Sequence, residues 1–124
     1  MITEDYVSFE TAKLLKEKGF DEQTVRYYNC WRELCQCECI VNETINSTSN
    51  YRTAAPTLQM AMKWLREVHN ICISVDVKIG GGKYYVCISS TENGLSHGVL
   101  EDEVWDTFEE ACEESIKYCL ENLI

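Results

Sequence analysis

ICISVDVKIGGGKYYVCISS, residues 71–90, has the clearest strand pattern in this chain. On both sides of three glycines, apolar side chains alternate with smaller or polar ones, which is the period-two pattern of half-buried strands. Because glycine readily adopts positive φ, Gly80 and Gly81 are predicted to form a two-residue hairpin turn. Pairing Ile79 with Gly82 then places all apolar pairs on one face. Those pairs are Val77 with Tyr84, Val75 with Val86, and Ile73 with Ile88.

Three further segments have the apolar spacing of amphipathic helices. In the first, Ser8 is a good N-cap and Gly19 a good C-terminal stop. In the last, Thr107 and Glu110 have capping-box spacing, and apolar residues then recur every three or four positions. The predicted helices cover residues 8–18, 57–69 and 107–123.

The segment between the first two helices is less regular. Residues 24–30 and 34–41 predict a second hairpin, with its turn near Trp31, and the polar residues 42–54 predict a loop. The predicted order is α-β-β-α-β-β-α. This is an α+β fold with a mainly antiparallel sheet of about four strands and three helices, in a single domain spanning residues 1–124.

The charge of the chain is strongly acidic and unevenly distributed. The formal net charge is −10, and residues 101–124 hold nine acidic residues and one lysine. Such a surface disfavours direct binding to nucleic acid and is typical of a solvated helix face or of a site for a basic partner. Because the chain has neither a long apolar run nor an export signal at its start, we expect a cytoplasmic protein without membrane contact.

CWRELCQCECI, residues 30–40, concentrates four of the eight cysteines. If residues 35–41 form a strand, Cys35, Cys37 and Cys39 share one face and act as small hydrophobic residues. Thiolates on one zinc ion lie roughly 3.8 Å apart, given bonds of about 2.3 Å. Same-face positions of a strand are about 6.6 Å apart. A regular strand therefore does not offer two of these sulfurs to one ion, and we expect structural thiols and no cofactor.

The other cysteines fit the same expectation of reduced thiols. Cys112 and Cys119 lie on the apolar stripe of the last predicted helix. Cys72 and Cys87 fall on the wetter face of the hairpin as diagonal neighbours, which disfavours a disulfide between them. His69 lies at the predicted end of the second helix, where a cation suits the helix dipole.

Three blocks of the chain resemble a family of small uncharacterised proteins from gut bacteria of the Bacteroides group. The blocks are YVSFETAKLLKEKGFD (6–21), APTLQMAMKWLREVH (55–69) and FEEACEESIKYCLENLI (108–124), about 50 of the 124 residues. The resemblance implies a phage or mobile-element setting and the cytoplasm of an anaerobe, hence reduced thiols. It carries over no catalytic residue, and the cysteine-rich stretch lies outside the three blocks.

The leading hypothesis is a non-enzymatic interaction module that binds another protein or itself. Its candidate contacts are Trp31 and Trp105 as exposed aromatic anchors, and Glu109 and Glu113 on the acidic helix. For both tryptophans packing in the core is the favoured prediction, and exposure as an anchor is the alternative on which this hypothesis depends. The alternative functions are a metal- or thiol-dependent enzyme that uses Cys35, Cys37 or Cys39, and an acidic nucleic-acid mimic that acts through residues 101–121.

Overall fold

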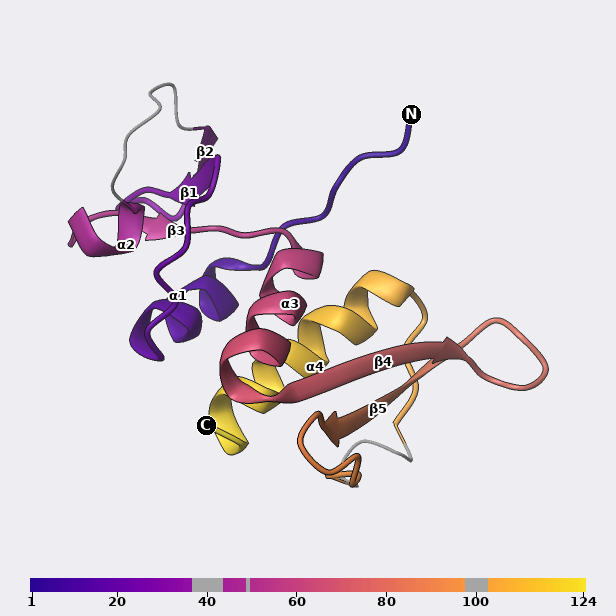
Figure 1. The fold of residues 1–124 in the computed structure, drawn as a ribbon. Coiled ribbons are helices and arrows are strands. Elements are labelled where there is room, and N and C mark those ends of the chain that lie inside the picture. Colours follow the sequence, from indigo (N-terminus) through magenta and orange to yellow (C-terminus); the bar gives the residue numbers. More distant parts are fainter. Residues whose placement is uncertain (37–43, 49, 98–102) are drawn as a thin grey trace. The chain divides into compact units, whose positions relative to one another are not determined.

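The structure, a computed structural model, describes residues 1–36, 44–48, 50–97 and 103–124 (Figure 1). These ranges contain four helices and five strands, and all the strands pair antiparallel. The predicted α+β class is confirmed. The strands form two sheets, one of three strands and one of two, where the sequence predicted one sheet of about four.

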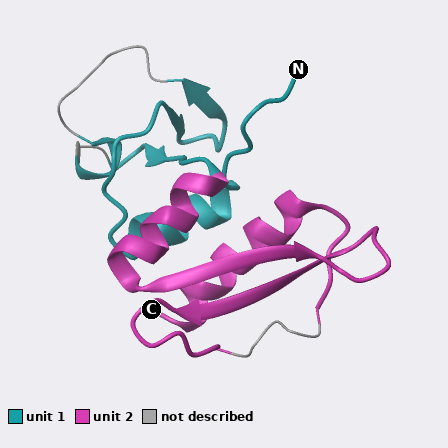
Figure 2. Cartoon of the chain, turned by 45° about the vertical axis from the view of Figure 1, so that its right-hand side comes forward, with its two compact units in different colours: residues 1–57 teal, residues 58–124 magenta. Residues whose placement is uncertain are grey.

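The chain divides into two compact units, Met1–Thr57 and Leu58–Ile124 (Figure 2). The first unit holds the three-stranded sheet and the second holds the two-stranded sheet. Each predicted hairpin therefore lies in a unit and a sheet of its own. The expectation of a single domain across residues 1–124 stays a prediction.

The first helix of unit 1 has the boundaries that its capping residues predict. Helix α1, Phe9–Glu17, begins after Ser8, whose hydroxyl accepts a hydrogen bond from the Thr11 backbone N–H at 3.2 Å. It ends at Lys18, and Gly19 follows with φ of +93°. This positive φ is the conformation that favours glycine after a helix.

The hairpin of unit 1 is formed as predicted in the part of it that is described. Strand β1, Arg26–Tyr28, pairs with β2, Leu34–Gln36, so that Tyr27 lies opposite Cys35. The rest of the predicted second strand, with Cys37 and Cys39, lies outside the described residues.

The loop predicted for residues 42–54 is wrong for residues 45–48 and 53–54. Helix α2, Ile45–Thr48, and strand β3, Thr53–Ala54, lie there, and β3 pairs with the free edge of β1. The amide of Asn46 donates to the Phe20 carbonyl at 2.7 Å and accepts from the Ala54 N–H at 2.9 Å. Side-chain hydrogen bonds therefore organise this segment, and an apolar periodicity does not reveal them.

The core of unit 1 is formed by α1 together with residues before and after it and with the segment 45–56. The Tyr28 hydroxyl donates to the Val7 carbonyl at 2.6 Å, and the Val7 N–H donates to the Pro56 carbonyl at 3.1 Å. These bonds fix the segment before α1. The buried residues are Val7, Thr11, Ala12, Leu15, Phe20, Ile45, Ala54, Ala55 and Pro56.

The hairpin of unit 2 has the predicted register but a longer turn. Strand β4, Ile71–Val77, pairs with β5, Tyr84–Ser90, in the predicted register throughout. The Lys78 N–H donates to the Lys83 carbonyl at 2.9 Å, so a four-residue loop follows, and Ile79 in it is fully exposed. The third glycine, Gly82, also has a positive φ of 80°. The strand pairing ends at Val77 and Tyr84, so the predicted Ile79–Gly82 pair does not form. The positive φ of all three glycines belongs to this longer loop, since a two-residue turn needs a positive φ at only two positions.

Two helices pack on one face of this hairpin, as Figure 1 shows. They are α3, Leu58–His69, and α4, Phe108–Asn122; α4 contacts both strands and α3. The covered face is the predicted apolar one, and the cysteine-bearing face is partly exposed. The buried residues of the covered face are Ile71, Ile73, Val86 and Ile88. The buried residues of α4 are Ala111, Cys112, Ser115, Ile116, Cys119 and Leu120.

Two residues of α3 differ from the predicted pattern. The apolar spacing of residues 57–69 predicts Val68 on the apolar face and Trp64 at its edge. In the structure Val68 is 53% exposed and Trp64 is buried. The His69 ring packs edge-on against the Trp64 ring with centroids 4.7 Å apart. The large indole is therefore buried against the His69 ring, whereas the smaller Val68 faces solvent.

Candidate functional site

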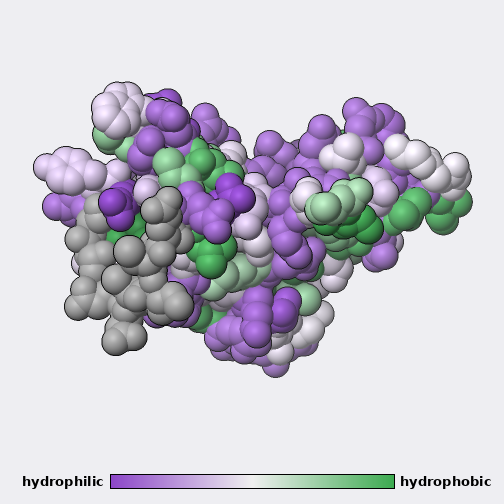
Figure 3. Space-filling view, turned by 90° about the horizontal axis from the view of Figure 1, so that it is seen from above, coloured by the Kyte–Doolittle hydropathy of each residue, from purple (hydrophilic) through white to green (hydrophobic). Residues whose placement is uncertain are grey.

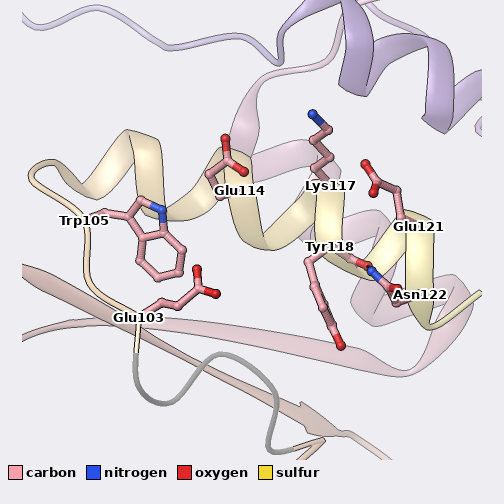
Figure 4. A pocket seen from close by; sticks show the side chains of 7 residues that line it. All are labelled: Glu103, Trp105, Glu114, Lys117, Tyr118, Glu121 and Asn122. Carbon is pink, nitrogen blue, oxygen red and sulfur yellow. The ribbon is translucent and has the colours of Figure 1, made fainter.

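The candidate site is a groove between α4 and the segment that leads into it (Figure 4). Its volume is about 310 Å³, which is at the small end of ligand pockets, about 300–1,000 Å³. We call it the α4 groove. Seven residues line it: Glu103, Trp105, Glu114, Lys117, Tyr118, Glu121 and Asn122.

The backbone around Trp105 is fixed to the sheet. Trp105 and Tyr84 exchange two backbone hydrogen bonds of 2.9 Å, which adds Trp105 to the free edge of β5. Asp106, which directly follows Trp105, forms an ion pair with Lys83. The Thr107 hydroxyl then accepts the Glu110 N–H at 3.1 Å and starts α4, as the capping-box spacing predicts. One wall of the groove is therefore held by strand pairing and a helix cap.

The other wall comes from the regular spacing of α4. Glu114, Tyr118 and Glu121 follow one another at four and three positions, which places them along one strip of a helix. Lys117 lies on the same strip, between the two glutamates. Figure 4 shows the Trp105 indole and the Glu103 carboxylate at one end of the groove, with Lys117 and Glu121 toward the other.

The groove carries an excess of negative charge. It has three carboxylates and one ammonium group, and the carboxylates of Glu103, Glu114 and Glu121 belong to exposed residues. Within the described part of the chain, none of these three carboxylates takes part in an ion pair. An aromatic ring beside uncompensated carboxylates is a combination that attracts organic cations.

The four residues predicted to bind a partner divide between the two units. Trp105 lines the groove, whereas Glu109 and Glu113 lie on α4 outside its lining. Trp31 belongs to the other unit and is 76% exposed. Packing in the core, the favoured prediction for both tryptophans, is wrong for Trp31, which is exposed, and Trp105 is only half-buried.

The turn that carries Trp31 is well ordered by its own hydrogen bonds. The Asn29 side-chain oxygen accepts the backbone N–H groups of Trp31 and Glu33, both at 2.9 Å. Arg32 takes a positive φ of 62°, and its guanidinium lies 4.9 Å from the centre of the Phe9 ring. The indole of Trp31 is therefore held out toward solvent by a structured turn.

The cysteine stretch shows no catalytic arrangement in its described part. The Cys35 thiol donates to the Glu33 carbonyl at 3.5 Å and accepts from the Asn29 amide at 3.5 Å. Cys37 and Cys39 lie outside the described residues. Within the described ranges, no three histidine, cysteine or acidic side chains are grouped so that they could hold a metal ion.

Two thiols are buried deeply enough to change their chemistry. Cys112 and Cys119 lie in the core of unit 2. Burial, with a smaller contribution from the Glu109 carboxylate, raises the pKa of Cys112 to about 11. Burial raises the pKa of Cys119 to about 12. Both thiols stay protonated near neutral pH and are poor nucleophiles. Cys72 and Cys87 are diagonal neighbours on β4 and β5, as predicted, and neither forms a disulfide.

The sequence did not predict most of the groove residues, because they are of types that are common on any protein surface. Glu114, Lys117, Tyr118 and Glu121 share a helical strip, and that spacing was a usable signal. What the spacing does not reveal is that Trp105 is held beside this strip through its pairing with β5.

No family model, curated protein or solved structure matches the chain. The resemblance to proteins of the Bacteroides group therefore stays a prediction. Across the residues that the structure describes, no helix combines the length and the apolar character needed to span a bilayer.

Proposed function

We propose that the chain is a non-enzymatic protein-interaction module whose α4 groove binds a basic segment of a partner protein. The observation that carries this proposal is the combination of an aromatic side chain, Trp105, with carboxylates that have no cationic partner among the described residues. Aromatic residues are common anchors of protein interfaces, and complementary charge selects the partner.

Polar contacts suit this chain better than a broad apolar interface. On the face shown in Figure 3, hydrophobic side chains form separate patches between hydrophilic ones. The groove residues contribute charge and one aromatic ring. Exposed ion pairs contribute about 0.2–1 kcal/mol each, and an exposed cation–π contact about 0.5–1 kcal/mol. We therefore expect a complex that forms and dissociates quickly, that has a modest affinity, and whose affinity falls as the salt concentration rises.

The proposed setting is the cytoplasm of an anaerobic bacterium, with a phage or mobile-element origin. The six cysteines in the described part of the chain are free thiols, and such a compartment keeps thiols reduced. The three sequence blocks that resemble Bacteroides-group proteins support it as well.

The experiment compares partner capture by matched charge variants of the full chain. One variant replaces the groove carboxylates (Glu103→Gln, Glu114→Gln, Glu121→Gln), and the control removes the same charge from exposed positions elsewhere (Glu4→Gln, Glu17→Gln, Glu67→Gln). We expect quantitative mass spectrometry to detect a partner that is captured by the native chain and by the control variant. The groove variant should no longer capture this partner. Equal capture by all three chains would refute the groove as the docking site.

An acidic nucleic-acid mimic is the second candidate. The exposed carboxylates of Glu109 and Glu110, at the start of α4 and outside the groove, favour it. In that case duplex DNA would displace the captured partner, and Glu109→Gln with Glu110→Gln would weaken capture as much as the groove variant does. Capture that is indifferent to DNA and to this pair would eliminate the mimic.

A further inference from the structure

We infer that the group bound in the α4 groove is the guanidinium of an arginine in the partner segment. This inference rests on the proposed function, because it names the chemistry that the same site recognises. The Trp105 end of the groove offers an aromatic ring with the Glu103 carboxylate close to it and Glu114 on the facing helix (Figure 4).

A planar, weakly hydrated guanidinium fits this combination better than an ammonium group does. Arginine stacks on an aromatic face and donates two parallel hydrogen bonds to a carboxylate, whereas lysine is a compact and strongly hydrated point charge. Unit 1 contains three examples of the arginine–ring part of this chemistry. There Arg26, Arg32 and Arg52 lie 5.4, 4.9 and 4.9 Å from the centres of the rings of Tyr6, Phe9 and Tyr27.

Lys117 determines which end of the groove receives the arginine. It lies on α4 three positions after Glu114 and four before Glu121, so its ammonium group opposes any cation near it. An incoming guanidinium is therefore favoured at the Trp105 end, away from Lys117. The geometry thus predicts opposite effects for removing the carboxylates and for removing this lysine.

The test uses fluorescein-labelled peptides and the full chain in fluorescence anisotropy. The peptides contain three cationic positions spaced by glycine and serine, filled with arginine, lysine or citrulline, the neutral isostere of arginine. We expect the arginine peptide to bind about fivefold more tightly than the lysine peptide, the equivalent of about 1 kcal/mol from stacking on the indole. The citrulline peptide should show no saturable binding.

The variants locate the contact within the groove. Trp105→Ala should weaken binding of the arginine peptide about fivefold, and Trp105→Phe, which keeps an aromatic face, should weaken it less. Glu103→Gln and Glu114→Gln should each weaken it by a factor of about two to five, and Lys117→Gln should tighten it by a similar factor. Glu67→Gln, an exposed glutamate of α3, is the matched control and should change nothing.

Each result has a defined meaning. Equal binding of the arginine and lysine peptides, or weaker binding after Lys117→Gln, overturns the inference. If partner capture still depends on the groove carboxylates in that case, the proposed function survives without it. If the peptide binds through Trp105 but capture ignores the groove, the inference stands and the proposed function fails. A circular-dichroism melt of each variant confirms that the helices are retained.

Discussion

At the scale of single residues, Asn46 shows how one side chain can organise a segment that lacks an apolar pattern. Its amide joins Phe20 to Ala54, at 2.7 and 2.9 Å, within a segment that has little apolar periodicity. Asn46→Ala leaves both backbone groups without this partner. We expect a loss of about 1–3 kcal/mol in the free energy of unfolding, measured by urea denaturation. Asn50→Ala, at an exposed position nearby, is the matched control and should cost less than about 0.5 kcal/mol.

The thiols differ in reactivity because burial differs. Cys30 is exposed, whereas Cys112 and Cys119 are buried with raised pKa values. At pH 8 we expect a thiol reagent such as dithionitrobenzoate to modify Cys30 rapidly and the two buried thiols only after denaturant is added. Mass spectrometry of the labelled peptides identifies the sites. Rapid labelling of Cys112 in the native chain would contradict its placement in the core.

The same pKa shifts predict how stability changes at alkaline pH. In the folded chain the pKa values of Cys112 and Cys119 rise from 9.0 to about 11 and about 12, because burial disfavours the thiolate. The unfolded chain therefore loses these protons first. The stabilisation is complete below pH 9 and declines as pH rises through the folded pKa values. We expect the urea midpoint to fall from pH 9 toward pH 11, and to fall less steeply in the variant with both cysteines changed to alanine.

At the scale of elements, the hairpin of unit 2 separates what a pattern determines from what it leaves open. The in-and-out alternation determined the register of β4 and β5, because a slip of one residue would expose every apolar side chain. It did not determine the turn, since three consecutive glycines allow more than one loop length. For Trp105, the sequence favoured burial in the core, with a role as an anchor as the alternative, and did not show which part of α4 lies beside it. That position follows from its pairing with Tyr84, a contact between distant parts of the chain.

The loop glycines are needed for their backbone conformation. Gly80, Gly81 and Gly82 have φ of 98°, 79° and 80°, a region that costs other residues about 1–2 kcal/mol. Gly81→Ala should therefore lower the free energy of unfolding by about 1 kcal/mol. Ile79→Ala, a change at a fully exposed side chain of the same loop, should leave it within about 0.5 kcal/mol. A larger loss for Ile79→Ala would mean that this side chain has a packing role.

At the scale of the whole molecule, the two units raise the question of cooperativity. Unit 1 has 57 residues, and a chain of about that size has little surface to bury and is only marginally stable alone. We expect both units to unfold in one transition. Native-state hydrogen exchange tests this: the buried helices α1 and α4 should give equal opening free energies at Leu15 and Leu120. A clearly lower value at Leu15 would make unit 1 a domain of its own.

Lys117 has a consequence for how this protein can adapt. It lies on the solvent side of α4, so its replacement leaves the buried face of the helix untouched. Under the proposed function, a single mutation there would change the strength of the interaction and leave the buried residues of α4 in place. On that proposal, position 117 would give natural selection a means of following a changing partner, while the residues that form the core stay under their own separate constraint.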